Sequence, residues 1–117
     1  MTNTIENLKN ELNNIPNLEV INNHSDVKRL SRDFYNYSPV LQKRLEGCLA
    51  DVVVRPKNID SLLAVSKICW ELSIPLTIRG GGTGNYGQAV PLAKGIVLQM
   101  NYFNKLEKYY PDSGFVK

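Results

Sequence analysis

The chain has 117 residues, of which 43% are hydrophobic and 21% are charged. These values are typical of one small globular domain and exclude a disordered, collagenous or coiled-coil chain. The formal net charge is +3, and the surplus of Lys and Arg is scattered over the sequence after Ala50. A nucleic-acid interface would cluster these residues on one face, so we expect no nucleic-acid partner, whereas a small anionic ligand is compatible with the charge.

No apolar run approaches the roughly 20 residues of a membrane span, and the first residues lack the basic and then apolar pattern of a signal peptide. Cys48 and Cys69 are far apart in the sequence, without a CxxC motif or a nearby His. This spacing indicates neither a metal site nor a disulfide framework. We therefore expect two reduced thiols in a cytoplasmic protein without an integral membrane segment.

The first part of the chain has mainly helical patterns. Hydrophobic residues spaced by three and four predict an amphipathic helix over residues 4–14, and residues 26–32 are compatible with a further helical turn. A third short helix is predicted to start at Ser38 and Pro39, which suit an N-cap and a first turn, and to stop at Gly47.

The second part predicts a crossover of strand, helix and strand. Three consecutive valines favour a buried strand over residues 51–55, which Pro56 ends. Asn58 is a suitable N-cap for a helix with a wide apolar face that continues to Leu72, and residues 76–79 form the next strand. Strands joined by such a crossover are expected to be parallel, with a right-handed connection.

Extended patterns continue to the last residue. Residues 95–100 predict a third strand and residues 106–110 a weaker fourth, followed by a turn at residues 111–114. Phe115 and Val116 then read as the start of an unfinished strand. Because unpaired sheet edges promote aggregation, we expect the chain to be a fragment of a longer protein or to complete its sheet with a partner.

The segment from Arg79 to Gly87, RGGGTGNYG, has five glycines in nine positions. Successive backbone N–H groups in such a loop can form a nest for an anion, and a pyrophosphate suits it. The alternative is a tight structural connection without a ligand. A dinucleotide-binding fingerprint is excluded because no helix is predicted to follow, and a P-loop is excluded because Gln88 and Ala89 replace its Lys and Ser or Thr.

Four segments, VVVRPKN, LLAVSKICWELSIPLTI, RGGGTGNYGQAVP and KGIVLQM, resemble the first part of the FAD-binding domain of FAD-linked oxidases. This is the vanillyl-alcohol oxidase and p-cresol methylhydroxylase type, which includes glycolate oxidase flavin subunits and D-lactate dehydrogenases. The resemblance covers residues 50–117. It implies an α+β fold, with a helical N-terminal segment at residues 1–49. A truncated FAD-binding subdomain with a small, partly parallel sheet and a β-α-β crossover then occupies residues 50–117.

The same resemblance implies FAD as the cofactor, with its pyrophosphate held mostly by the backbone of the glycine loop. Thr83 stands where some relatives carry a His bonded covalently to the flavin, which implies non-covalent binding here. Tyr86 lies inside the loop and is either a flank of the cofactor or an aromatic packed on its own backbone. The implied cofactor-binding residues are Arg79, Gly80, Gly81, Gly82, Thr83, Gly84, Gln88 and Pro56.

By the same resemblance, the activity is that of a flavin-dependent oxidoreductase acting on a 2-hydroxy acid or a similar alcohol. Family members are several times longer, and the parts that would bind substrate and complete the cofactor pocket are absent here. No catalytic residue is therefore predicted. Two alternatives stay open: a non-catalytic, truncated interaction module that completes its sheet with a partner chain, and a remnant that neither folds stably nor binds a ligand.

Overall fold

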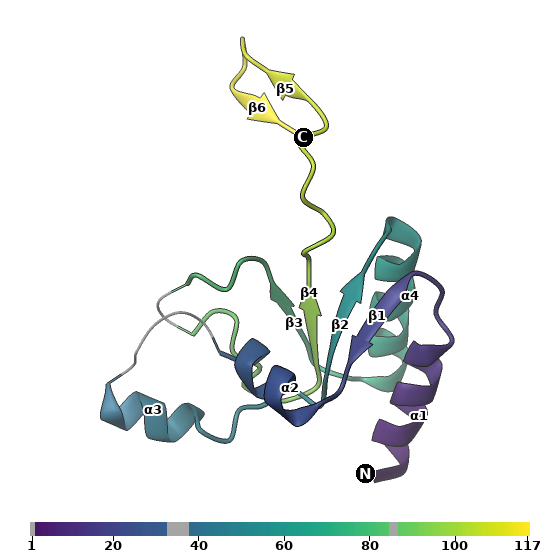
Figure 1. Cartoon of the computed structure of the whole chain (residues 1–117), viewed down its shortest axis with the longest axis vertical. Coiled ribbons are helices and arrows are strands. Elements are labelled where there is room, and N and C mark those ends of the chain that lie inside the picture. The colour runs from purple at the N-terminus through teal and green to yellow at the C-terminus, as the bar shows by residue number, and fades with distance from the viewer. Residues whose placement is uncertain (1, 33–37, 85–86) are drawn as a thin grey trace.

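A four-stranded sheet with the order β1-β2-β4-β3 forms the centre of the computed structural model (Figure 1). Residues 2–32, 38–84 and 87–117 are described by the structure. The strands of this sheet are β1 (Leu18–Ile21), β2 (Val52–Pro56), β3 (Leu76–Arg79) and β4 (Ile96–Gln99). The strands β2, β4 and β3 are mutually parallel, whereas β1 pairs with β2 in the antiparallel direction.

The two faces of the sheet are buried by different helices. The helices are α1 (Thr2–Asn13), α2 (His24–Leu30), α3 (Pro39–Leu45) and α4 (Ile59–Leu72). Val52 and Val54 lie in a core with residues of α1 and α4, whereas Val53 packs in a second core with residues of α2. Because successive side chains of a strand point to opposite faces, the valine run contributes to both cores. The result is three layers, with the sheet in the middle (Figure 1).

Residues at the two ends of the helix α4 determine where it begins and ends. Asn58 and Ser61 form a capping box, in which the Asn58 side chain accepts a hydrogen bond from the Ser61 amide at 2.9 Å. At the other end Ser73 adopts a left-handed conformation (φ 55°), which stops the helix before Pro75. The crossover from β2 through α4 to β3 is therefore as predicted. However, β4 lies between the two parallel strands, so β2 and β3 are not neighbours.

Two expectations from the sequence need correction. The N-terminal segment is not only helical, because residues 18–21 form β1, which pairs with β2 over four residues. The weak fourth strand is much shorter than predicted: only Tyr109–Tyr110 (β5) is extended, and it pairs with Phe115–Val116 (β6) in a separate hairpin. The last segment is therefore paired within this hairpin rather than being the open edge of the main sheet.

The β5–β6 hairpin projects from the body on an extended segment that leaves β4 (Figure 1). All residues from 101 to 117 are exposed. The radius of gyration of 15.7 Å accordingly exceeds the value of about 13 Å expected for a compact chain of this length. The layered body and the hairpin thus have few contacts with each other.

Candidate functional site

The glycine loop begins where β3 ends, at the edge of the sheet where all three parallel strands have their carboxyl ends (Figure 1). Residues 80–84 follow Arg79, the last residue of β3, and Pro56 is the last residue of β2. In open α/β sheets, ligands bind outside the carboxyl ends of the strands. The fold therefore places the loop at the edge where a ligand is expected.

The backbone amides of the loop make no hydrogen bonds within the described part of the chain. Among the described residues, no hydrogen bond joins the N–H groups of residues 80–84 to a carbonyl or a side chain of the protein. Gly80 and Gly81 are exposed. A Cβ atom added to Gly80 would meet nothing within 4 Å, and one added to Gly81 would meet only the Thr83 methyl group, at 3.8 Å. The outer side of the loop is therefore open to a ligand.

Gly82 differs from its two neighbours because it faces inward. It has a φ of +70°, and a Cβ atom there would overlap the Nη2 and Cζ atoms of Arg79. Both the left-handed backbone and the contact with the guanidinium favour glycine at this position. The loop thus has an open outer side and an inner side that rests on Arg79.

Arg79 is 9% exposed and lies beneath the loop, on the sheet face that α2 covers. Its Nη1 donates to the carbonyl of Leu30, at 3.4 Å, and to that of Arg32. The guanidinium lies against Gly82 and the carboxyl end of α2. Its contact with the cofactor stays a prediction.

The remaining predicted residues lie around the loop at different depths. Thr83 is exposed, so its hydroxyl is accessible beside the loop amides. Gln88 is also exposed, in a turn that follows the loop. Pro56 is fully buried at the end of β2, opposite Leu18 of β1. Tyr86 lies outside the described residues.

A row of polar side chains at the same edge of the sheet was not predicted from the sequence. Arg55 Nη1 pairs with Glu19 Oε1 at 2.9 Å, and Arg55 Nε donates to Gln99 Oε1 at 2.6 Å. Gln99 is only 7% exposed and lies opposite Arg79 in the parallel register. Because these residues belong to three strands far apart in the sequence, only the pairing of β1, β2 and β4 brings them together.

Tyr102 extends this polar row beyond the end of β4. Its hydroxyl donates to Glu19 Oε2 at 2.7 Å. This hydrogen bond, together with the Arg55 guanidinium, holds the pKa of Glu19 below its usual value, and the same bond raises the pKa of Tyr102. The ammonium of Lys57 lies 5.7 Å from the centre of the Tyr102 ring. The segment after β4 is thus fixed to β1 before it leaves the body.

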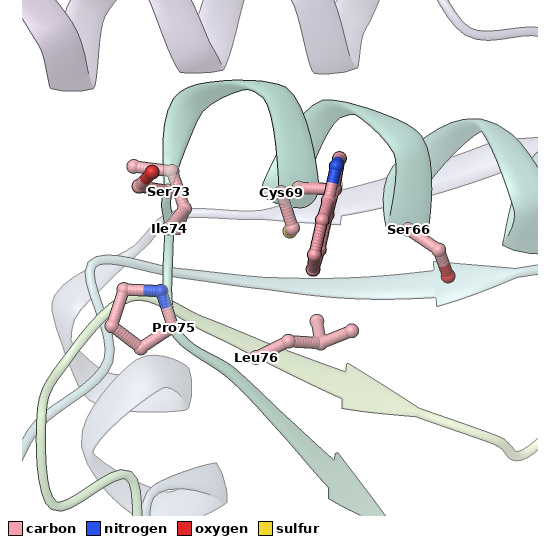
Figure 2. Close-up of a pocket in the computed structure, with 7 residues that line it drawn as sticks. Ser66, Cys69, Ser73, Ile74, Pro75 and Leu76 are labelled. Atoms are coloured by element: carbon pink, nitrogen blue, oxygen red, sulfur yellow. The ribbon is translucent and has the colours of Figure 1, made fainter.

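An open groove of about 530 Å³ lies at the opposite end of β3, where α4 turns into the strand (Figure 2). Ser66 and Cys69 of α4 contribute to one wall, and Pro75 and Leu76 to the other. Burial raises the pKa of the Cys69 thiol, which disfavours a reactive thiolate there. The groove begins at the amino end of β3, so it is separate from the glycine loop.

The described residues offer neither a metal site nor a membrane-spanning helix. No group of three His, Cys, Asp or Glu residues is placed to hold a metal ion in this part of the chain. None of its helices has the length and the apolar composition needed to cross a membrane. The glycine loop is therefore the candidate site that the fold best supports.

Comparison with known proteins gives a family match over the second part of the chain. The FAD-binding domain family matches residues 50–117. A D-lactate dehydrogenase of Archaeoglobus fulgidus is 48% identical over 56 residues, covering 48% of this chain and 13% of that protein. The glycolate oxidase subunit GlcD of Escherichia coli is 32% identical over 92 residues, covering 79% of this chain and 17% of that protein. The chain therefore spans less than a fifth of the length of either relative.

The solved structure of p-cresol methylhydroxylase matches with a TM-score of 0.63 at 19% sequence identity. The match covers 95% of this chain and 20% of that one. At this identity the likeness concerns the fold alone. It confirms the predicted α+β class, and the sequence matches confirm the resemblance that rested on the four quoted segments.

Proposed function

This chain belongs to the FAD-binding domain family, and we propose that its glycine loop binds the pyrophosphate of FAD without a covalent bond. The proposed contacts are the backbone amides of residues 80–84, with the hydroxyl of Thr83 beside them. Gln88 is proposed to contact the cofactor further along. The buried Pro56 would contribute by fixing the end of β2, and Arg79 by its place beneath Gly82.

The observation that carries this proposal is the row of loop amides without an acceptor inside the described part of the chain. A diphosphate is a suitable acceptor because its oxygens are charged, and hydrogen bonds to charged groups contribute about 1.5 to 3 kcal/mol each. The loop has no Asp or Glu from residue 79 to residue 84, and a guanidinium lies directly beneath it. The residues present therefore fit an anionic ligand.

At the scale of the whole protein, we propose a flavin-dependent oxidoreductase that oxidises a 2-hydroxy acid or a similar alcohol. Bound FAD supplies the capacity to accept two electrons, which no side chain of this chain offers. The substrate class is supported by the names of the two relatives, since lactate and glycolate are both 2-hydroxy acids. The proposed role of this chain is to hold the cofactor, and no catalytic residue is assigned to it. The two unpaired thiols support a cytoplasmic location.

The experiment is a titration of the purified chain with FAD, followed by quenching of flavin fluorescence. Gly81→Val is the sharpest variant, because its side chain would occupy the open outer side of the loop while meeting only Thr83 within the protein. We expect this variant to fold and to lose at least about tenfold in affinity, since one lost charged hydrogen bond accounts for about that factor.

Gly47→Val is the matched control for this titration. A Cβ atom on Gly47 meets nothing within 4 Å, so the added side chain is tolerated there as well, but Gly47 follows α3 rather than β3. It should bind FAD as the unmodified chain does. Equal affinity for FAD in the Gly81→Val and Gly47→Val variants would disprove the pyrophosphate site.

An interaction module is the second candidate function, and the free edge of the sheet favours it. β3 has a neighbour on one side only, its Ile78 is 65% exposed, and Trp70 on the adjacent α4 is 86% exposed. A partner chain, or further segments of the same protein, could cover this edge. A folded, dimeric chain that leaves FAD fluorescence unchanged would favour this function over cofactor binding.

A further inference from the structure

We infer that Arg79 is a positioning residue, whose guanidinium joins the glycine loop to the carboxyl end of α2 and thereby sets the conformation of Gly82. The expected effect on FAD binding rests on the proposed function. The contacts of Arg79 with α2 and Gly82 lie within the chain and do not depend on it.

Arg79 contacts the carboxyl end of α2. Its Nη1 donates to the carbonyl of Leu30, the last residue of the helix, and to that of Arg32, two residues further on. The last carbonyls of a helix have no partner within the helix and need an external donor. The guanidinium supplies that donor from β3, 47 to 49 residues further along the chain.

Hydrogen bonds and packing hold the end of α2 to the sheet. Ser31 is fully buried. Its hydroxyl donates to the carbonyl of Val27 at 2.6 Å and accepts the amide of Ala50 at 3.0 Å. Val27 and Leu30 also pack against Val53 and Val97 of the sheet. The carbonyls that hold Arg79 are therefore fixed to the sheet, and Arg79 is fixed in turn.

The guanidinium of Arg79 lies directly against Gly82. A Cβ atom on Gly82 would overlap Nη2 and Cζ of Arg79 and lie 3.0 Å from Nε. The loop backbone can lie this close to the guanidinium only because residue 82 has no side chain. Arg suits this place better than Lys, because a guanidinium donates hydrogen bonds in its plane while its flat faces can contact the backbone.

This arrangement gives the N-terminal segment a role in the site. The family match starts at residue 50, whereas the carbonyls that hold Arg79 belong to residues 30 and 32. The glycine loop lies within the residues that match the family, but the residues that hold it in place through Arg79 lie before that match.

A double-mutant cycle on the full chain tests the contact without any cofactor. Gly82→Ala, Arg79→Ala and the double variant are unfolded in urea. When Arg79 is present, Gly82→Ala destabilises the chain through left-handed backbone strain and through overlap of the new Cβ atom with the guanidinium. When Arg79 is replaced by Ala, only the backbone strain contributes. We expect the effect of Gly82→Ala on the unfolding equilibrium constant to be about tenfold smaller in the Arg79→Ala background, within the usual range for contacting residues.

Lys94→Gly is the control for backbone strain within the body. Lys94 has a φ of 61°, so this change relieves left-handed strain, and its effect should be the same with and without Arg79. If Arg79→Ala fails to fold, Arg79→Gln replaces it, because Gln keeps a donor but has no atom at the position of Nη2. Equal effects of Gly82→Ala in both backgrounds would overturn the inference.

A second arm measures FAD binding by Arg79→Ala in the presence of millimolar ethylguanidinium, with ethylammonium as the control cation. We expect the affinity to recover by several fold with ethylguanidinium only. If the affinity stays equally low with both cations while the unmodified chain binds FAD, Arg79 does not position the loop through its guanidinium. If the unmodified chain does not bind FAD, the proposed function fails, and the unfolding cycle alone decides the inference.

Discussion

At Gly82 two separate physical requirements favour glycine. The backbone has a φ of +70°, and the space that a side chain would need is filled by the Arg79 guanidinium. Gly81 next to it meets neither requirement, and we propose that its lack of a side chain serves ligand binding. Two neighbouring glycines in one motif thus serve different purposes, and substitutions at each are expected to have different effects on stability and binding.

Glu19 permits a prediction of pH dependence. Tyr102 and Arg55 lower its pKa in the folded chain, so the unfolded chain binds the proton more readily in the acid range. This contribution to stability is complete above the ordinary glutamate pKa of about 4.3 and is lost as the pH falls through the lower folded value. We expect Glu19→Gln to destabilise the chain at pH 7 by about 0.2 to 1 kcal/mol, since the pair is partly exposed. The difference should shrink as the pH falls below about 4.3.

Urea unfolding at several pH values measures this effect. Glu6→Gln is the control, because Glu6 is exposed on α1 and belongs to no ion pair within the described residues. A Glu19→Gln variant whose difference from the unmodified chain is the same at pH 7 and pH 3 would contradict the proposed pairing.

At the scale of elements, α4 links the two outer parallel strands and positions the start of the loop. The helix buries Val65 and Cys69 against β2 and β4, while its capping box fixes the turn that leaves β2. β3 follows the left-handed Ser73 after only two further residues. The placement of β3, and hence of Arg79, depends on where this helix begins and ends.

Removal of the N-cap of α4 should therefore weaken the whole body. Asn58→Ala removes the acceptor for the Ser61 amide, and the loss of such a cap typically costs about 1 kcal/mol of unfolding free energy. Asn104→Ala, in the exposed segment after β4, is the control and should change stability by less than about 0.5 kcal/mol. Equal unfolding midpoints for the two variants would show that the cap is dispensable.

At the scale of the whole molecule, the chain consists of a layered body and a hairpin that projects from it (Figure 1). The body buries both faces of its sheet, whereas β5 and β6 pair only with each other and their residues are exposed. Isolated two-stranded hairpins are marginally stable in water. The hairpin is therefore expected to open independently of the body.

Truncation after Asn104 tests this independence. Since the residues removed have no place in either core, the unfolding free energy of the body should change by less than about 0.5 kcal/mol. Hydrogen exchange of the intact chain should show protected amides in β2 and β4 and fast exchange throughout residues 105–117. A large loss of stability on truncation would mean that the hairpin supports the body.

The sequence by itself determined the local elements, the family and the candidate loop. The valine run, the Asn58 cap and the glycine motif are each specified by neighbouring residues, so α4, β2, β3 and the position of the loop were predicted correctly. By contrast, the apolar and polar alternation in β1 spans only Leu18, Glu19 and Val20. It is too short to distinguish a strand, and pairing with β2 makes it one.

Only the tertiary structure decided which distant residues meet. It inserted β4 between β2 and β3, gathered Glu19, Arg55 and Gln99 into one row, and brought the carbonyls of Leu30 and Arg32 to Arg79. Strand order and the packing of helices on a sheet depend on contacts between residues dozens of positions apart. No local pattern of residues encodes such contacts, whereas caps, turns and glycine loops are specified within a few positions.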